Sequence, residues 1–323
     1  MSLIARSRES WLAASLRPNF RSDQSIRGWI TAEAWTPSAG MSKKRLQGIV
    51  NTPEVFGEAC IRDAVKLGVA AFESAAQVDA ATVDARSCAW QFIKYYYAAF
   101  FAANGLMRLS GQACINLTAL DCASVNSWVL AHGVGGARDQ NKLAPGLFQL
   151  SFDATNNPTF TLQLQSGKGG VHIQFWTGFS IFLDRLRSNI KHGPAPKAER
   201  DAAIAELDLL EGELKRGGVT HASWLSEMRN AVNYRFEHGA WFPYDAQDSD
   251  KIALRDSFKL HAQGPNRFVP APAATSDMVR AGRVCGFLIG WLRDSFGLIA
   301  ERAKGEKGML VKGALTFVGV LPR

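Results

Sequence analysis

The segment from residue 90 to residue 107 has the sequence WQFIKYYYAAFFAANGLM, which indicates secondary structure more clearly than any other part of the chain. Its large side chains recur in alternating steps of three and four residues, the spacing of one face of an α-helix. Gly111 follows soon after, and glycine commonly ends helices. The pattern predicts a helix over about residues 86–110 whose apolar stripe faces a protein core.

The flanking sequence carries the same helical spacing in several places. The additional predicted helices cover residues 53–77, 175–190, 197–216, a segment from Trp224 onward, and 278–303. Residues 112–172 differ, because glycine, asparagine, serine and threonine become frequent there. Within them, residues 147–152 and 160–164 have the pattern of short strands joined by a turn. Residues 29–35 fit either a strand or a short helix. We therefore predict an α+β protein that is mainly α.

These patterns divide the chain into an N-terminal extension, a helical domain with a β-containing insertion, and a C-terminal tail. The expected ranges are 1–85 for the extension, 86–304 for the domain, about 112–172 for the insertion and 305–323 for the tail. The chain has 323 residues, of which 47% are apolar, and this composition excludes a disordered polymer. No apolar run approaches the roughly 20 residues of a membrane span, so we expect no membrane partner.

The charge and the cysteines give weaker indications. Lysine and arginine number 37 and aspartate and glutamate 29, so the net charge is +8. This charge favours a polyanionic partner such as nucleic acid, but it also fits a charge that only maintains solubility. The five cysteines form no C-x-x-C pair, so we expect a reducing, cytoplasmic location and no structural zinc. Residues 1–22 fit a basic segment that packs on the domain better than a transit peptide.

Residues 224–239, with the sequence WLSEMRNAVNYRFEHG, contain the side chains that best fit a functional site. On a helical wheel, four polar residues share one face and apolar residues occupy the opposite face. The four are Arg229, Asn230, Asn233 and Tyr234. Arg235 would fall among the apolar residues, so we expect the helix to end soon after Tyr234. His238 would then approach Arg229 only if the chain turns or if another subunit supplies the histidine.

This polar helix and the upstream aromatic run of residues 95–101 resemble the HEPN superfamily of helical-bundle proteins. The resemblance covers about residues 86–110 and 174–303. HEPN proteins are often dimeric, many are metal-independent endoribonucleases, and they recur in toxin–antitoxin and antiphage defence systems. Their signature is an arginine followed by a polar residue and, after about four to six intervening residues, a histidine. Here Arg229 and Asn230 fit the start, Tyr234 holds the first histidine position, and His238 comes later.

The resemblance implies a HEPN-like bundle and a role for each residue. Arg229 would hold the scissile phosphate, since arginine makes permanent bidentate phosphate contacts. His238 would act as acid and base, because histidine titrates near neutral pH. Asn230 and Tyr234 would support them, and the candidate RNA contacts are Asn233, Arg235 and Lys168. No cofactor or metal is expected, and the expected partners are RNA, a second copy of the chain, and an antitoxin or defence-system protein.

Two alternatives stay open. A non-catalytic HEPN-like module would bind RNA or a protein without cleavage, and a helical scaffold would have no nucleic-acid role. An arginine on a helix face is often only solvated or salt-bridged, and His238 beside Gly239 equally fits a helix C-terminus. The glycine-rich segments at 133–138 and 167–170 lack the features of nucleotide-binding loops and are predicted to be turns.

Overall fold

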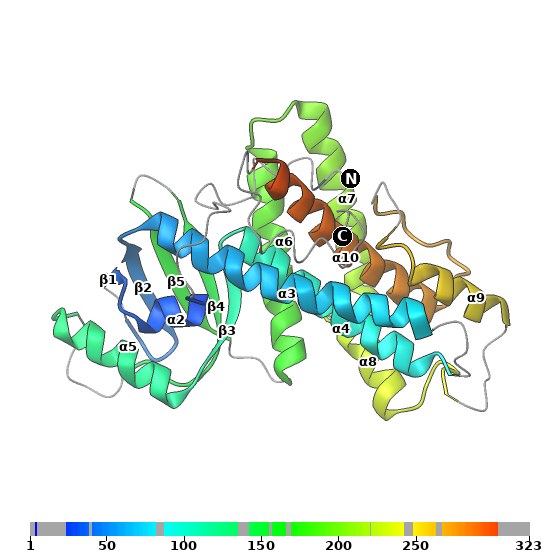
Figure 1. Cartoon of the computed structure of the whole chain (residues 1–323), viewed down its shortest axis with the longest axis horizontal. Coiled ribbons are helices and arrows are strands. Elements are labelled where there is room, and N and C mark those ends of the chain that lie inside the picture. The colour runs from blue at the N-terminus through cyan, green and yellow to red at the C-terminus, as the bar shows by residue number, and fades with distance from the viewer. Residues whose placement is uncertain are drawn as a thin grey trace. The chain divides into compact units, whose positions relative to one another are not determined.

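The computed structural model describes Ile4 and residues 24–38, 41–81, 87–134, 142–154, 157–165, 169–219, 221–241, 248–262 and 267–302. They form an α+β fold that is mainly helical, which confirms the expected fold class (Figure 1). The chain divides into two compact units. The sheet unit holds the described residues within 24–64 and 107–178, and the helical unit holds Ile4 and those within 65–106 and 179–302. The predicted tail at 305–323 and most of residues 1–22 lie outside the described residues.

The sheet unit contains a five-stranded antiparallel sheet in the order β1-β2-β5-β4-β3. The strands are β1 (Trp35–Pro37), β2 (Arg45–Val50), β3 (Gln112–Leu117), β4 (Gly146–Asp153) and β5 (Thr159–Leu164). The two strands expected at 147–152 and 160–164 are confirmed, and β2 and β3 are additional. Side chains of alternate residues face the core, and one apolar row crosses four strands through Leu46, Leu162, Leu150 and Ala113.

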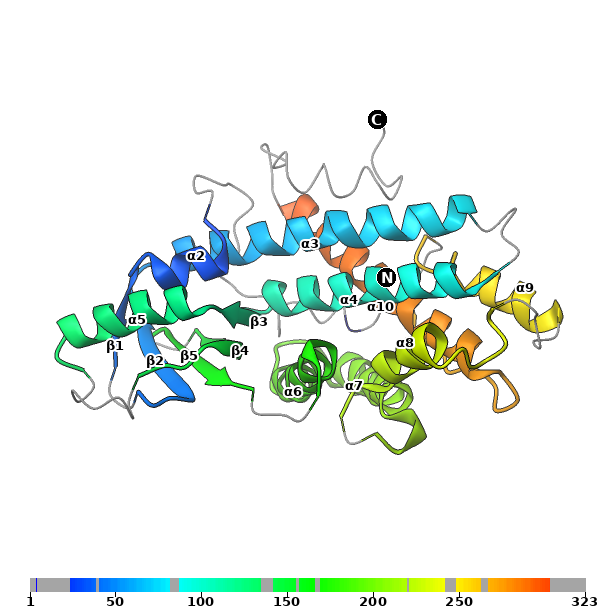
Figure 2. The same ribbon diagram turned by 90° about the horizontal axis from the view of Figure 1, so that it is seen from below.

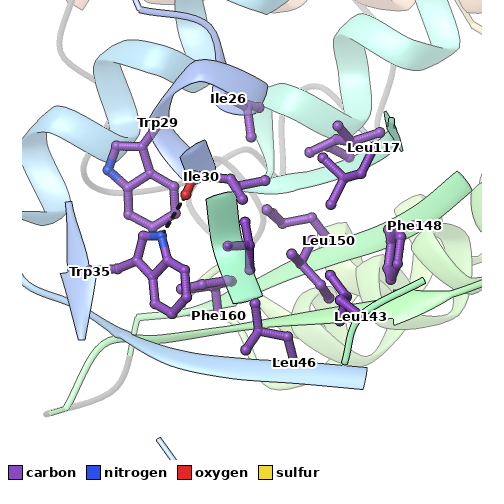
Figure 3. Packing of buried hydrophobic residues seen from close by; sticks show 14 of the residues in the cluster. Ile26, Trp29, Ile30, Trp35, Leu46, Leu117, Leu143, Phe148, Leu150 and Phe160 are labelled. Atoms are coloured by element: carbon purple, nitrogen blue, oxygen red, sulfur yellow. Dashed lines mark hydrogen bonds between the residues drawn. The ribbon is translucent and has the colours of Figure 1, made fainter. Parts of the chain in front are cut away.

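Three helices supply most of the rest of this core, to which the loop residues Met41 and Leu143 are added. They are α2 (Ile26–Thr31), the start of α3 (Pro53–Ala81) and α5 (Ala119–Ala131). Figure 3 shows how side chains of α2 and of the strands gather, with the indole N–H of Trp35 donating to the Ile30 carbonyl at 2.9 Å. Residues 29–35 were expected to form either a strand or a short helix. The range contains the end of α2 and the first residue of β1. Helix α5 is additional, and it begins with a capping box between Thr118 and Asp121.

The helical unit is built around α10. Its helices include parts of α3, of α4 (Ala89–Leu109) and of α6 (Val171–Lys191), and all of α7 (Lys197–Leu214), α8 (Trp224–Tyr234), α9 (Asp248–Ser257) and α10 (Asp277–Arg302). Helix α10 contacts α7, α8 and α9 (Figure 1 and Figure 2). Its Phe296 ring meets Phe72 of α3, and its Trp291 ring stacks on Phe182 of α6, both at 6.1 Å between centroids. The helices expected from the sequence are confirmed, and α9 is additional.

Two further expectations concern helix ends and cysteines. Helix α4 ends two residues before Gly111, which adopts a φ of 73° that favours glycine. All five cysteines are buried and free, so no disulfide joins them. Within the described ranges, no helix combines the length and the apolar character that crossing a bilayer requires.

Candidate functional site

Helix α8 carries the predicted site residues. It begins at Trp224 and ends at Tyr234, with Arg235 at the C-cap, so its predicted start and end are both confirmed. Ser223 occupies the N-cap position, but its side chain makes no capping hydrogen bond. The apolar side of the helix is buried through Leu225, Met228, Ala231 and Val232. This burial fixes the rotation of α8 and thereby the direction of its polar residues.

Arg229 lies between α8 and α4 instead of on an open polar face. Only 7% of the surface of the Arg229 residue is exposed to solvent. Its Nη2 donates a hydrogen bond of 2.8 Å to the Tyr97 hydroxyl of α4, and its Nη1 donates one of 2.7 Å to the Asn230 side-chain oxygen. Because α4 and α8 belong to the same unit, this contact is part of one compact body (Figure 1 and Figure 2).

Three tyrosine rings surround the guanidinium of Arg229. Its Cζ lies 5.5 Å from the ring centroid of Tyr97, 5.6 Å from that of Tyr234 and 5.8 Å from that of Tyr96. Such distances allow cation–π attraction, which contributes about 0.5–2 kcal/mol per ring according to how far the pair is desolvated. The rings and the two hydrogen bonds hold the cation in place without neutralising its charge. We call Arg229, Asn230, Tyr96, Tyr97 and Tyr234 the arginine cage.

The charge of Arg229 has no carboxylate partner among the described residues. The other two buried arginines of the described helical unit each have one: Arg280 pairs with Glu213 at 2.8 Å, and Arg293 pairs with Asp294 at 2.7 Å. In addition, the buried Nε of Arg229 makes no hydrogen bond in the described part of the chain. Since buried charges in proteins are normally paired, the arginine cage is suited to receive an anion.

The chain turns sharply after α8. Phe236, His238 and Gly239 adopt φ values of 57°, 65° and 58°, in the left-handed region that bulky residues seldom occupy. The turn is held by the Trp241 indole, which donates to the Val232 carbonyl at 2.7 Å, and by the Glu237 N–H, which donates to Ala231 at 3.1 Å. The chain therefore turns beyond α8, which is one of the two conditions for His238 to approach Arg229.

His238 stands on this turn with its side chain exposed to solvent. No hydrogen bond, ion pair or ring contact with another described residue involves its imidazole, so the structure does not bring it to Arg229 within the protomer. The ring is free to meet a substrate or a second copy of the chain. Its assignment as acid and base stays a prediction.

The remaining predicted contacts have different surroundings. Asn233 is half-buried on the same side of α8 as Asn230. Arg235 is half-exposed and pairs with Glu237 at 2.8 Å and with Glu227 at 3.9 Å, so surface carboxylates already balance its charge. Lys168 lies outside the described residues.

Tyr96 and Tyr97 of α4 are the site residues that the sequence pattern did not identify. Their helical spacing assigns them to a core, and Tyr96 is indeed fully buried. Tyr97, however, is only half-buried and directs its hydroxyl to Arg229. The tyrosine hydroxyl was the feature of the sequence that could have identified them. A buried tyrosine among phenylalanines and alanines requires a hydrogen-bond partner for its hydroxyl.

Burial shifts the pKa of titratable groups outside the arginine cage. The thiol pKa of Cys114 is raised to about 12 by burial, which makes the thiol unreactive near neutral pH. Burial also lowers the pKa of His261 to about 4, and its Nδ1 lies 3.0 Å from the Tyr95 hydroxyl inside the helical unit. No group of three or more metal-ligating side chains occurs in the described ranges.

Comparisons with known proteins add no assignment. Neither a protein-family model, nor a curated protein, nor a solved structure matches the chain.

Proposed function

We propose that this chain is an RNA-binding protein of HEPN type that cleaves RNA without a metal ion, as a toxin or antiphage effector. The observation that carries the proposal is the unneutralised charge of Arg229. Arg229 is a largely buried residue whose guanidinium is held by neutral groups only, so its charge fits an anionic ligand. An RNA phosphodiester supplies that anion, and the net charge of +8 favours attraction of a polyanion over the whole molecule.

Arg229 then acts on the phosphate in two ways. It holds the phosphodiester through charge-assisted hydrogen bonds, and it stabilises the extra negative charge of the phosphorane transition state. Asn230 accepts a hydrogen bond from one guanidinium nitrogen, and Tyr97 accepts one from the other. Both residues therefore act as positioning residues that orient the guanidinium toward the phosphate.

His238 supplies the proton transfers in this proposal. The RNA 2′-oxygen attacks phosphorus as a base removes its proton, and the bond from phosphorus to the 5′-oxygen breaks as an acid protonates that oxygen. The products are a 2′,3′-cyclic phosphate and a 5′-hydroxyl, and no water is consumed. One imidazole cannot start the step as both base and acid, so two copies of His238 in a homodimer provide them.

The second candidate is a HEPN-like module that binds RNA without cutting it. The observation that favours it is the absence of any contact between His238 and Arg229 in the described protomer. Both candidates share the arginine cage as the phosphate site. They differ only in whether a histidine reaches the bound phosphodiester.

One experiment separates the two candidates. Purified protein is incubated with mixed single-stranded RNA in EDTA, beside the variants Arg229→Met and His238→Ala. An endoribonuclease cleaves in EDTA, leaves cyclic phosphate ends, does not cut 2′-O-methyl RNA, and is inactivated by both substitutions. A binding module shifts RNA on a gel, and only Arg229→Met weakens the shift. The proposal as a whole is refuted if wild-type protein neither cleaves nor binds RNA.

A further inference from the structure

An aromatic surface lies next to the arginine cage at the start of α4. Trp90 is 57% exposed and Phe236 is 67% exposed, and both rings contact the partly buried Trp241. The centroid distances to Trp241 are 5.5 Å from Trp90 and 5.8 Å from Phe236. We call Trp90, Phe236 and Trp241 the aromatic edge. Large exposed aromatic groups that cluster in this way usually mark a binding surface.

Two hydrogen bonds anchor the segment that carries Phe236 and Trp241. The Trp241 indole donates to the Val232 carbonyl of α8 at 2.7 Å, and the Ser87 hydroxyl donates to the Ala240 carbonyl at 3.0 Å. These bonds fasten the turn after α8 to both α8 and the residues before α4. Phe236 meanwhile keeps a left-handed φ of 57° and an exposed ring, a costly arrangement for an aromatic residue.

One face of α4 connects the aromatic edge to the arginine cage. Trp90, Lys94 and Tyr97 are spaced by four and then three residues, so they lie on the same side of the helix. Trp90 and Tyr97 are about 10 Å apart along the helix axis at 1.5 Å per residue. Lys94 is exposed between them and forms no ion pair with the other described residues. This face therefore presents, in order, the Trp90 ring, the Lys94 ammonium group and the guanidinium of Arg229.

The chemistry of this face selects one class of ligand. An apolar peptide could cover the rings, but it would leave the charges of Lys94 and Arg229 unbalanced. A single-stranded nucleic acid offers a base that stacks on an aromatic ring and phosphates that balance the cations. Duplex RNA does not fit equally well, because its bases are already stacked inside the helix.

Resting on the proposed function, we infer that the aromatic edge is the stacking platform for an unpaired base adjacent to the phosphate held by Arg229. The RNA is then bound by a base that stacks on Trp90 or Phe236 and by a phosphate in the arginine cage. Trp241 contacts both exposed rings and is itself held by its hydrogen bond to the Val232 carbonyl.

The test measures RNA affinity without cleavage. A short fluorescent 2′-O-methyl oligonucleotide is titrated in EDTA, as a single strand and as a duplex, with wild type, Trp90→Ala, Phe236→Ala, Trp90→Phe and Arg229→Met. Ile252→Ala is the control, because Ile252 is also an exposed apolar residue, on α9 and 60% exposed. Circular dichroism checks that every variant is folded. Trp90→Ala is expected to weaken single-strand binding by about 5- to 100-fold, the effect of losing one stacked base.

The remaining results each support or refute the inference. Retained binding by Trp90→Phe and by Ile252→Ala, with weaker binding of the duplex to wild type, supports the stacking platform. If Arg229→Met loses binding while Trp90→Ala and Phe236→Ala bind as wild type, the stacking platform is refuted and the proposed function stands. If Trp90→Ala only dissociates a dimer, the aromatic edge is a contact between copies and the inference is wrong. If wild type binds no RNA, the proposed function fails first.

Discussion

Replacement of Arg229 by methionine should weaken ligand binding at almost no cost in stability. In the folded protein, the guanidinium makes two hydrogen bonds and three ring contacts. Together these contribute about 5 kcal/mol. Burying an unpaired cation costs several kcal/mol, which nearly cancels that gain. Methionine keeps the apolar contacts with the rings, and the half-buried Tyr97 and Asn230 can exchange their lost hydrogen bonds for water.

Arg280→Met is the matched comparison. Arg280 is also buried, but it pairs with Glu213 and donates to the carbonyls of Ala273 and Thr275. Its loss leaves a carboxylate in a largely buried position, and breaking such a pair typically costs about 3–5 kcal/mol. We therefore expect the free energy of unfolding to change by less than about 1 kcal/mol for Arg229→Met and to fall by about 3–5 kcal/mol for Arg280→Met.

Urea unfolding followed by tryptophan fluorescence measures both variants under one condition. Titration with the 2′-O-methyl oligonucleotide in EDTA then measures binding. We expect Arg229→Met to be stable and to bind about 10- to 100-fold more weakly, whereas Arg280→Met is destabilised and binds as wild type when folded. A loss of more than about 3 kcal/mol for Arg229→Met with unchanged RNA affinity would show that the arginine has a structural role only.

Two further predictions concern the helical unit. Gly68→Ala should lower the free energy of unfolding by about 1–3 kcal/mol, because the new Cβ would lie 2.3 Å from the Phe296 ring. Urea unfolding measures this loss. A urea midpoint equal to that of wild type would contradict the packing. Burial, reinforced by the nearby Arg293, lowers the pKa of His261 in the folded protein to about 4. Between pH 6.5 and pH 4 the imidazole is therefore neutral in the folded protein, whereas it becomes protonated in the unfolded chain. The free energy of unfolding should therefore be fully retained above pH 6.5 and fall by up to about 3 kcal/mol between pH 6.5 and pH 4. Unfolding by urea at several pH values measures this loss, and His261→Gln should lack it; an equal pH dependence in both proteins would count against the assignment.

Long helices could be predicted because their periodicity is local. Helices α3, α4 and α10 repeat apolar residues over several turns, and their buried faces agree with that pattern. Strand β2 is different, since it is short, follows a basic cluster and contains Gly48 in its interior. A Cβ at Gly48 would lie 2.6 Å from Phe160 and 2.7 Å from Trp35, so the glycine is required by close packing. That requirement is visible only in three dimensions.

The site could be predicted only in part for the same reason. The end of α8 after Tyr234 follows from the apolar position that Arg235 would occupy, and this is local information. The burial of Arg229 depends on Tyr97, which is 132 residues away in the sequence. A helical wheel contains no such partner, so it predicts an exposed cation where the structure has a caged one.

The most direct test of the account is the affinity of single-stranded RNA for wild type and for Arg229→Met. Both proteins are titrated with the same 2′-O-methyl oligonucleotide in EDTA at one fixed salt concentration, because phosphate contacts depend on salt. The account predicts measurable binding by wild type and, after loss of a charge-assisted phosphate contact of about 1.5–3 kcal/mol, an affinity lower by about 10- to 100-fold in the variant. Equal affinities would contradict the claim that the caged guanidinium binds RNA phosphate.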